Sequence, residues 1–246
     1  MPKILKMLDK SDDFTTHKDL LPDLPFRGIL VAKTGSGKTS AIGSLLLLEE
    51  FYLNEFSGDD IYIFSPLKND YKMETIIKVK EIPEGNIYRG FDDEILGMTY
   101  DKLADEFENA VTLGDKPTNK LVILDDLSFS GDLRKGTYNN VARVFQNGRK
   151  MLISCLVTTQ FYHSILPAVR ENASFLMVFN TSLRQLESIA EEHNYLESKK
   201  KFIKMFRENV KERHDFIVVN HSNEAINLYL DKNFESIIPK MISNER

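Results

Sequence analysis

Short apolar segments alternate with longer amphipathic segments along this chain. Each apolar segment is about as long as a typical strand, and several are apolar throughout, so we expect strands that are buried on both faces. The predicted strands are Arg27–Ala32, Asp60–Ser65, Asn86–Tyr88, Lys120–Asp125, Met151–Thr158, Ser174–Phe179, Phe216–Asn220 and Ile226–Leu230. The last two are expected to close the fold as a strand pair.

The segments between these strands carry apolar residues at helical spacing. The predicted helices are Lys38–Phe51, Thr99–Asn109, Thr137–Arg149, Ser164–Glu171, Ser182–His193 and Glu197–Arg213. The segment Met73–Pro83 gives no clear assignment. Strands that alternate with helices predict an α/β protein with a mainly parallel sheet and helices on both faces. Residues 1–25 are polar and contain three prolines, so we expect an N-terminal extension followed by a single domain over residues 26–246.

The composition fits a protein with a substantial core. The chain has 246 residues, of which 42% are hydrophobic and 28% charged, enough for one large α/β domain. No apolar run approaches the roughly 20 residues that a membrane span needs, and Met1–Asp13 lacks the apolar centre of a secretion signal. Cys155 is the only cysteine, so no disulfide can form within the chain, which fits a reducing compartment.

The net charge of −5 gives no overall basic footprint for nucleic acid. Positive charge gathers only locally, in Ser198–Arg213, which holds seven basic and two acidic residues. This segment is either a solvated helix face or a nucleic-acid contact, and the sequence leaves both interpretations open.

A glycine-rich segment, AKTGSGKT at residues 32–39, joins the first predicted strand to the first predicted helix. It matches the end of the P-loop pattern, although Ala32 stands where the pattern has glycine. The backbone N–H groups of such a turn and of the helix start bind phosphate oxygens. Lys38 is expected to bridge the β- and γ-phosphates, and Thr39 to place its hydroxyl on Mg²⁺. The predicted nucleotide-binding residues are Lys33, Thr34, Gly35, Ser36, Gly37, Lys38, Thr39 and Ser40.

Two carboxylates end the apolar strand LVIL. Asp125 and Asp126 follow it directly, so a parallel sheet would place them at the edge where ligands bind. Asp125 is expected to hold Mg²⁺, and Asp126 to orient or deprotonate the attacking water. The alternative is an ordinary polar turn after the strand. The phosphate loop in the same domain favours the metal site over this alternative.

Three further polar residues are catalytic candidates. Gln160 follows the strand Met151–Thr158, where its amide has both a donor and an acceptor for the γ-phosphate and the attacking water. Arg149 precedes that strand and therefore lies at the opposite edge, so it is expected to act on the nucleotide of a neighbouring subunit. Arg170 is the competing candidate for that role. A surface position without a catalytic role is the alternative for each of the three.

Together these stretches resemble the FtsK–HerA superfamily of DNA-pumping ATPases, and in particular the poxvirus-type genome-packaging ATPases of large DNA viruses and virophages. The resemblance rests on GILVAKTGSGKTS, on KLVILDDL, and on NGRKMLISCLVTTQ followed by LPAVRENAS, and it covers Phe26–Asn180. The small size of the chain is similar to that of the virophage proteins. Family members often carry Gly-Arg-His where this chain has Gly148-Arg149-Lys150, so Arg149 matches the family arginine while its neighbour does not.

The resemblance implies a P-loop fold of the additional-strand type, in which a strand lies between those of the two nucleotide motifs. It also implies ATP hydrolysis with Mg²⁺, a homo-oligomeric ring of five or six copies, and double-stranded DNA in the central channel. Further implied partners are proteins of a viral capsid vertex or membrane. The implied location is the host-cell cytoplasm or virus factory, with association with the virion.

Other functions remain open at this point. A nucleoside or nucleotide kinase would carry an arginine-rich lid and an acceptor site, which the sequence does not suggest. A nucleotide-gated switch or assembly protein would bind ATP without turnover. A helicase or conjugation-type motor of the same superfamily would usually bring additional nucleic-acid modules.

Overall fold

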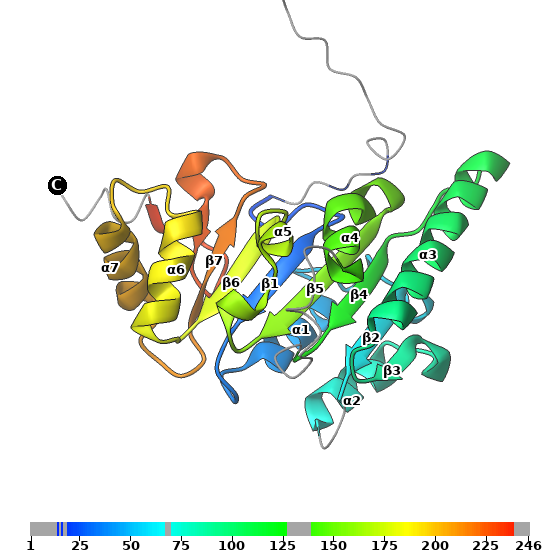
Figure 1. Ribbon diagram of the computed structural model, residues 1–246, viewed down its shortest axis with the longest axis horizontal. Coiled ribbons are helices and arrows are strands. Elements are labelled where there is room, and N and C mark those ends of the chain that lie inside the picture. Colours follow the sequence, from blue (N-terminus) through cyan, green and yellow to red (C-terminus); the bar gives the residue numbers. More distant parts are fainter. Residues whose placement is uncertain (1–13, 15, 17–18, 67–69, 127–138, 239–246) are drawn as a thin grey trace, which may run out of the picture.

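The computed structural model describes residues 14, 16, 19–66, 70–126 and 139–238. It shows one twisted sheet between two layers of helices (Figure 1). The eight strands are β1 (Arg27–Val31), β2 (Ile61–Ser65), β3 (Ile87–Arg89), β4 (Lys120–Leu124), β5 (Ile153–Thr159), β6 (Phe175–Phe179), β7 (Phe216–Asn220) and β8 (Tyr229–Leu230). Their order in the sheet is β3-β2-β4-β5-β1-β6-β7-β8.

Six neighbouring strands, from β3 to β6, run parallel, and β7 pairs antiparallel with both β6 and β8. Strand β5 lies between β1, which leads into the phosphate loop, and β4, which leads into the two carboxylates. This order confirms the predicted α/β class and the additional strand between the nucleotide motifs. All seven residues of β5 are buried, as expected of a central parallel strand.

Helices cover both faces of the sheet (Figure 1). They are α1 (Lys38–Leu47), α2 (Tyr71–Val79), α3 (Asp93–Leu113), α4 (Asn140–Asn147), α5 (Pro167–Arg170), α6 (Leu183–His193) and α7 (Lys199–Asn209). Successive residues of β1 point to opposite faces: Ile29 packs in the core beneath α3, α4, α6 and α7, and Leu30 in the core beneath α1 and α2. Side chains that alternate along each strand therefore pack into two separate cores, one on each face of the sheet.

Several predicted boundaries shift because of local capping. The predicted helix Thr99–Asn109 is the middle of α3, which starts earlier because Asp92 caps it by accepting from Glu94 N and Ile95 N. Gly114, at φ +79°, ends it in a left-handed turn. The unassigned segment Met73–Pro83 is largely α2, whose start is capped by Asp70. These boundaries depend on side-chain hydrogen bonds that the apolar spacing does not encode.

Other predicted elements are shorter than expected. Helix α1 ends at Leu47 rather than Phe51, α7 ends at Asn209 rather than Arg213, and β8 holds two residues. The predicted helix Ser164–Glu171 contains the single turn α5, and Thr137–Arg149 gives α4 and a 3-10 turn, with its first residues outside the described part.

The described residues of the N-terminal segment pack on the domain. Leu24 is fully buried in the core beneath α1, the backbone carbonyl of Pro22 accepts from Tyr52 Oη at 2.6 Å, and that of Leu20 accepts from Asn220 Nδ2 at 3.0 Å. Within the described part of the chain, no helix has the length and apolar character needed to traverse a bilayer.

Candidate nucleotide-binding site

Except for the two arginines, the predicted site residues meet at the carboxyl edge of the sheet, which is the edge where the parallel strands end. The phosphate loop follows β1, Asp125 and Asp126 follow β4, and Gln160 follows β5. They surround a cavity of about 300 Å³. Its lining is Lys33, Thr34, Gly35, Gly37, Lys38, Thr39, Asp70, Lys72, Asp125, Asp126 and Gln160. The chain thus brings residues 33 to 160 together in one concave, polar site.

Two glycines give the phosphate loop its shape. Gly35 has φ +74° and Gly37 has φ +107°, conformations that disfavour any side chain with a Cβ. Gly37 is also the N-cap of α1 and provides no side-chain cap. The first N–H groups of α1 are therefore left for an anion, toward which the helix dipole also points.

Lys38 lies across the loop, and its Nζ donates to the carbonyl of Ala32 at 3.0 Å. Partial burial lowers the pKa of this ammonium, while Asp126 and Asp125 act in the opposite direction. A cation that is half desolvated and has carboxylates nearby gains from an added polyanion, because the phosphates restore interactions that water no longer supplies.

Asp125 is held from both sides by the neighbouring strands. Ser65 Oγ, at the end of β2, donates to Oδ2 at 3.0 Å, and Thr158 Oγ1, on β5, donates to Oδ1 at 2.7 Å. Burial raises the pKa of Asp125 against the effect of these two hydrogen bonds. Each carboxylate oxygen therefore has a fixed direction and remains partly desolvated, which favours interaction with a cation.

Asp126 takes up a left-handed backbone conformation with φ +52°. Its N–H donates to Thr158 Oγ1 at 2.9 Å, and its Oδ1 accepts from Gln160 Nε2 at 3.3 Å. Aspartate tolerates this conformation better than most residues, and such strain is often found at functional sites. Thr158 thus fixes both acids, and Asp126 and Gln160 point toward one another.

Besides Ser65 and Thr158, four residues that contact the phosphate loop are not predicted from the sequence as part of this site. Asp70 accepts from Thr39 Oγ1 at 3.1 Å through Oδ2, while its Oδ1 caps α2. Lys72 Nζ donates to Ser40 Oγ at 2.6 Å. An acid before a helix is a recognisable cap signal, but the sequence holds no sign that this cap also reaches the phosphate loop.

The other two missed residues lie in the turn between α7 and β7. Arg213 Nε donates to the carbonyl of Gly35 at 3.1 Å, and His214 Nδ1 lies 3.1 Å from the carbonyl of Ser36. A Cβ added to Gly35 would lie 2.6 Å from Arg213 Nη2. Arg213 was noted from sequence only as part of the basic segment, since a contact across 178 residues leaves no local signal.

The two arginine candidates lie outside the cavity. Arg149 lies in a 3-10 turn, Gly148–Met151, immediately before β5, hence at the amino edge of the sheet, as the sequence predicts. Arg170 makes a bidentate ion pair with Glu192, Nε to Oε2 at 3.0 Å and Nη2 to Oε1 at 2.8 Å, and also donates to Ile165 O at 2.8 Å. Its guanidinium is committed within its own chain.

Residues 13–240 match the family described as Poxvirus A32 protein. No curated protein matches the sequence.

Solved structures share the fold at low sequence identity. The genome packaging NTPase B204 from Sulfolobus turreted icosahedral virus 2, in complex with AMP, is 12% identical with a TM-score of 0.56, covering 80% of this chain and 93% of that chain. EssC (ATPases 2 and 3) from Geobacillus thermodenitrificans is also 12% identical with a TM-score of 0.56, covering 85% and 39%. These likenesses confirm the predicted fold, and the family match extends over nearly the whole chain, beyond the segment that carried the resemblance. The chain therefore belongs to the poxvirus A32 protein family and is a P-loop ATPase.

Proposed function

We propose that this chain is an ATP-driven motor that moves double-stranded DNA into a viral capsid. The observation that carries the proposal is the single cavity where the phosphate loop, the two acids and Gln160 meet. The B204 structures, described as those of a genome packaging NTPase, cover 80% of this chain and 93% of their own in the same fold, which supports a packaging role over a small-molecule kinase.

Each residue has a role that its chemistry supports. Lys38 and the loop N–H groups neutralise the β- and γ-phosphates. Thr39 and Asp125 would hold Mg²⁺, since hydroxyl and carboxylate oxygens are ligands that this ion prefers; when bound, it polarises the phosphoryl oxygens. Asp126 accepts a proton or hydrogen bond from the attacking water, and Gln160 orients that water through its amide.

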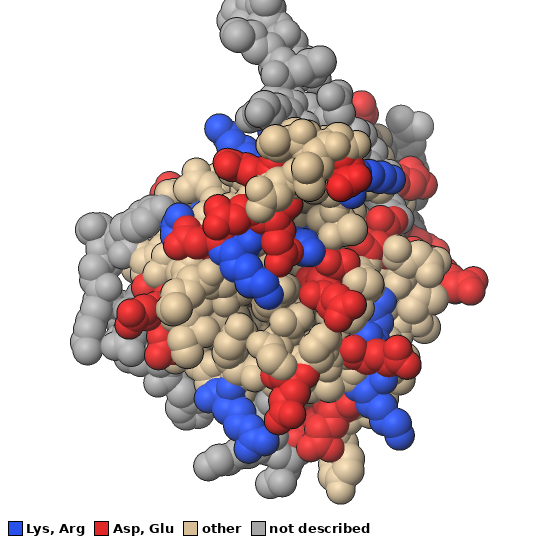
Figure 2. All heavy atoms as spheres, turned by 90° about the vertical axis from the view of Figure 1, so that its right-hand side faces the viewer, with Lys and Arg blue, Asp and Glu red and all other residues tan. Residues whose placement is uncertain are grey.

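The ring is supported by the two flanks of the sheet, where the helical layer ends. Helix α3 lies at one flank and exposes acids along its outer side: Glu94, Asp101, Asp105 and Glu108. Figure 2 shows acidic side chains over this flank, with basic ones among them. Helix α7 lies at the other flank (Figure 1) and exposes the bases Lys199, Lys200, Lys204 and Arg207. Lys199 pairs with Glu191 and Lys204 with Glu208. An excess of acids on one helix and of bases on the other favours a head-to-tail contact between copies, which generates a ring when it closes.

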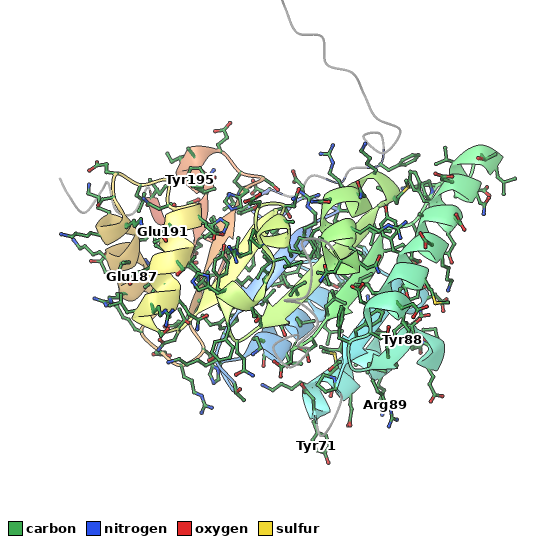
Figure 3. The ribbon with its side chains drawn as sticks, viewed as in Figure 1. Tyr71, Tyr88, Arg89, Glu187, Glu191 and Tyr195 are labelled. Atoms are coloured by element: carbon green, nitrogen blue, oxygen red, sulfur yellow. The ribbon has the colours of Figure 1, made fainter. Side chains whose placement is uncertain are left out.

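Both ends of the molecule also carry exposed aromatic residues. Tyr71 is 81% exposed at the end of the molecule that holds α2 and the exposed Arg89. Tyr195 is 65% exposed at the α6 end, where Glu187 and Glu191 are exposed as well. Figure 3 shows these two groups at opposite ends of the molecule. Tyrosine and arginine are common in interface cores, so both ends suit contacts between subunits.

In such a ring, Arg149 acts on the nucleotide of the neighbouring subunit and DNA occupies the central channel. Arg170 would have to leave Glu192 to play the same part, which is why we assign the role to Arg149. The ring would dock on proteins of a capsid vertex or membrane, in the host-cell cytoplasm or virus factory.

The test is ATPase activity of the purified full chain with and without double-stranded DNA. We expect turnover that rises on addition of DNA and disappears in Lys38→Ala, while Lys78→Ala, which removes an exposed lysine on α2, retains it. A turnover rate that DNA does not change would contradict the motor. Tight ATP binding without turnover would instead support a nucleotide-gated switch.

A further inference from the structure

A second cavity adjoins the phosphate site. It has a volume of about 770 Å³ and shares Gly37 and Lys72 with the 300 Å³ phosphate cavity. It runs along α1 toward the first residues of β7, and we call it the α1–β7 cavity. Its volume lies within the roughly 300–1,000 Å³ that small-ligand sites occupy. A ligand whose phosphates lie on the loop therefore has continuous space beside its phosphate end.

We infer that the α1–β7 cavity holds the nucleoside half of the triphosphate, with the base against the partly exposed ring of Phe216, which packs against the buried ring of Phe179. The inference rests on the proposed function, because it assumes that the loop binds a nucleoside triphosphate. It adds the residues that receive the base, for which the sequence contains no recognisable motif.

The walls of the cavity have the chemistry that a base requires. Ala41 and Leu45 on α1 and Met177 on β6 form apolar surfaces. The rings of Phe179 and Phe216 have centroids 4.8 Å apart at an interplanar angle of 40°, and Phe216 is partly exposed. A planar base stacks on such a surface, and aromatic contacts of this kind accept any base because every base has a π-face.

Polar side chains also line the cavity. They are Ser40, Ser44, Glu50, Lys72, His214, Lys232 and Asn233. Lys72 Nζ donates to Ser40 Oγ at 2.6 Å beside the phosphate loop, and Lys232 pairs with Asp215 at 2.6 Å. Apolar walls with a few polar groups are the usual composition of a small-ligand site. Ribose hydroxyls would lie beside Ser40 and Lys72, between the phosphates and the base.

The turn between α7 and β7 contacts both the α1–β7 cavity and the phosphate loop. His214 lines the α1–β7 cavity, and its Nδ1 lies 3.1 Å from the carbonyl of Ser36 in the phosphate loop. A base on Phe216 would therefore lie against the same turn that supports the loop. Binding of the nucleoside would fix this turn, so we expect nucleosides to improve the binding of the phosphates they carry.

A third cavity, of about 700 Å³, lies at the amino edge of the sheet. Its arginine, Arg170, is paired with Glu192, and its two histidines, His193 and His221, lie 3.1 Å apart through Nδ1 and Nε2. It has no contact with the phosphate loop, so a nucleotide anchored by that loop does not reach it. Of these two large cavities in the described part of the chain, the α1–β7 cavity is the one that adjoins the phosphate loop.

The aromatic wall of the cavity contacts the ring face of a base and makes no hydrogen bonds to its edge. Asn233 is the one carboxamide in the lining of this cavity, whereas recognition of a particular base usually needs several hydrogen bonds to its edge. We expect the site to prefer ATP strongly over inorganic tripolyphosphate and to separate ATP from GTP by less than about tenfold.

Calorimetric titration of the full chain with ATP, GTP and tripolyphosphate, each with Mg²⁺, tests this inference. Ser44 lines the cavity from α1, so Ser44→Phe should fill the space that the base needs, and Ser44→Ala is the matched control. We expect Ser44→Phe to weaken ATP binding by about 5- to 100-fold, the range that loss of one stacked base implies. Tripolyphosphate binding should change by less than about twofold.

A second variant distinguishes loss of base binding from a local folding defect in Ser44→Phe. Phe216→Ala should produce the same selective loss, with thermal unfolding recorded for each variant. Unchanged ATP affinity in both variants, or an equal loss of ATP and tripolyphosphate affinity in both, would overturn the inference. Failure of the proposed function gives a different result. A chain that is no motor would show no DNA-stimulated turnover in the ATPase assay, whatever these titrations give, and a chain that is no ATPase would bind neither ATP nor tripolyphosphate as wild type.

Discussion

Two partly buried polar clusters of this molecule look alike in composition but differ in how their charges are held. The first, at the carboxyl edge, consists of Ser65, Asp125, Asp126, Thr158 and Gln160. Its acids are fixed by neutral hydroxyl and amide donors, and the cation that acts on them is Lys38, across the cavity in the phosphate loop. These acids and Lys38 all line an open cavity, where a bound cation and a polyanion can reach them.

The second cluster lies beside α6 and consists of Tyr162, Arg170, Glu192, His193 and His221. Glu192 accepts from both Arg170 and Tyr162 Oη, the latter at 2.6 Å, and His193 Nε2 lies 2.6 Å from Tyr162 Oη. Here each charge has its counter-charge within the chain. Partial burial of polar groups alone therefore does not indicate a binding site. The first cluster indicates one because its charged groups line an open cavity and are not joined in a direct ion pair like that of Arg170 and Glu192.

The largest expected effect is in the first cluster. Asp125→Asn keeps the shape and removes the charge, so ATPase turnover should fall by at least about 10²- to 10³-fold, while the melting temperature stays equal or rises because a desolvated carboxylate is lost. Steady-state ATPase assays and thermal unfolding of the same sample check both. Retained turnover would exclude Asp125 as the metal ligand.

Gln160→Ala should lower turnover by about 10²-fold and leave nucleotide affinity within about twofold, because the amide acts on the attacking water and not on the loop. Single-turnover hydrolysis and ATP titration separate the two effects. A change confined to affinity would show that Gln160 binds substrate and does not assist the chemical step.

The second cluster predicts effects on stability. Arg170→Ala leaves Glu192 without its cation, and since the arginine side chain is only 12% exposed, the free energy of unfolding should fall by about 2–4 kcal/mol. Arg143→Ala removes an ion pair to Asp101 that is far more exposed, and should cost less than about 1 kcal/mol. Urea denaturation measures both.

Arg170→Ala and Arg149→Ala together distinguish the two arginine candidates. Turnover per folded molecule should remain near wild type in Arg170→Ala. In Arg149→Ala turnover should fall, and only under conditions where the ring assembles. If instead Arg170→Ala loses turnover without losing stability, Arg170 is the arginine that acts between subunits.

The last prediction concerns the pH dependence of the free energy of unfolding. Burial, followed by His221, lowers the pKa of His193 to about 4, with Glu192 acting in the opposite direction, while an unfolded histidine titrates near 6.5. Between these values the unfolded state binds a proton that the folded state does not, so stability decreases as the pH falls from 6.5 to 4. From pH 7.5 to 5 this amounts to about 2 kcal/mol. In urea denaturation, His193→Gln should lose less free energy of unfolding between pH 7.5 and 5 than wild type does. An equal loss would show that His193 is not the source of the pH dependence.

The sequence draws attention to three of the five residues of the first cluster, and to Arg170 alone of the second. Asp125, Asp126 and Gln160 each follow an apolar strand, and parallel strands bring such positions to one edge. Asp70, Arg213 and His214 reach the phosphate loop through contacts across 31 and 178 residues, for which no local pattern exists. The same holds for Arg170, whose partner Glu192 lies 22 residues away on α6. Sequence patterns locate strand ends, whereas the pairing of side chains across elements requires the folded structure.

The most direct test is a crystal or cryo-EM structure with a non-hydrolysable ATP analogue and Mg²⁺. Our account predicts the phosphates on the N–H groups of Gly35 to Thr39, the metal beside Asp125, and the base in the α1–β7 cavity. A nucleotide bound in the amino-edge cavity beside Arg170, with the phosphate loop empty, would contradict it.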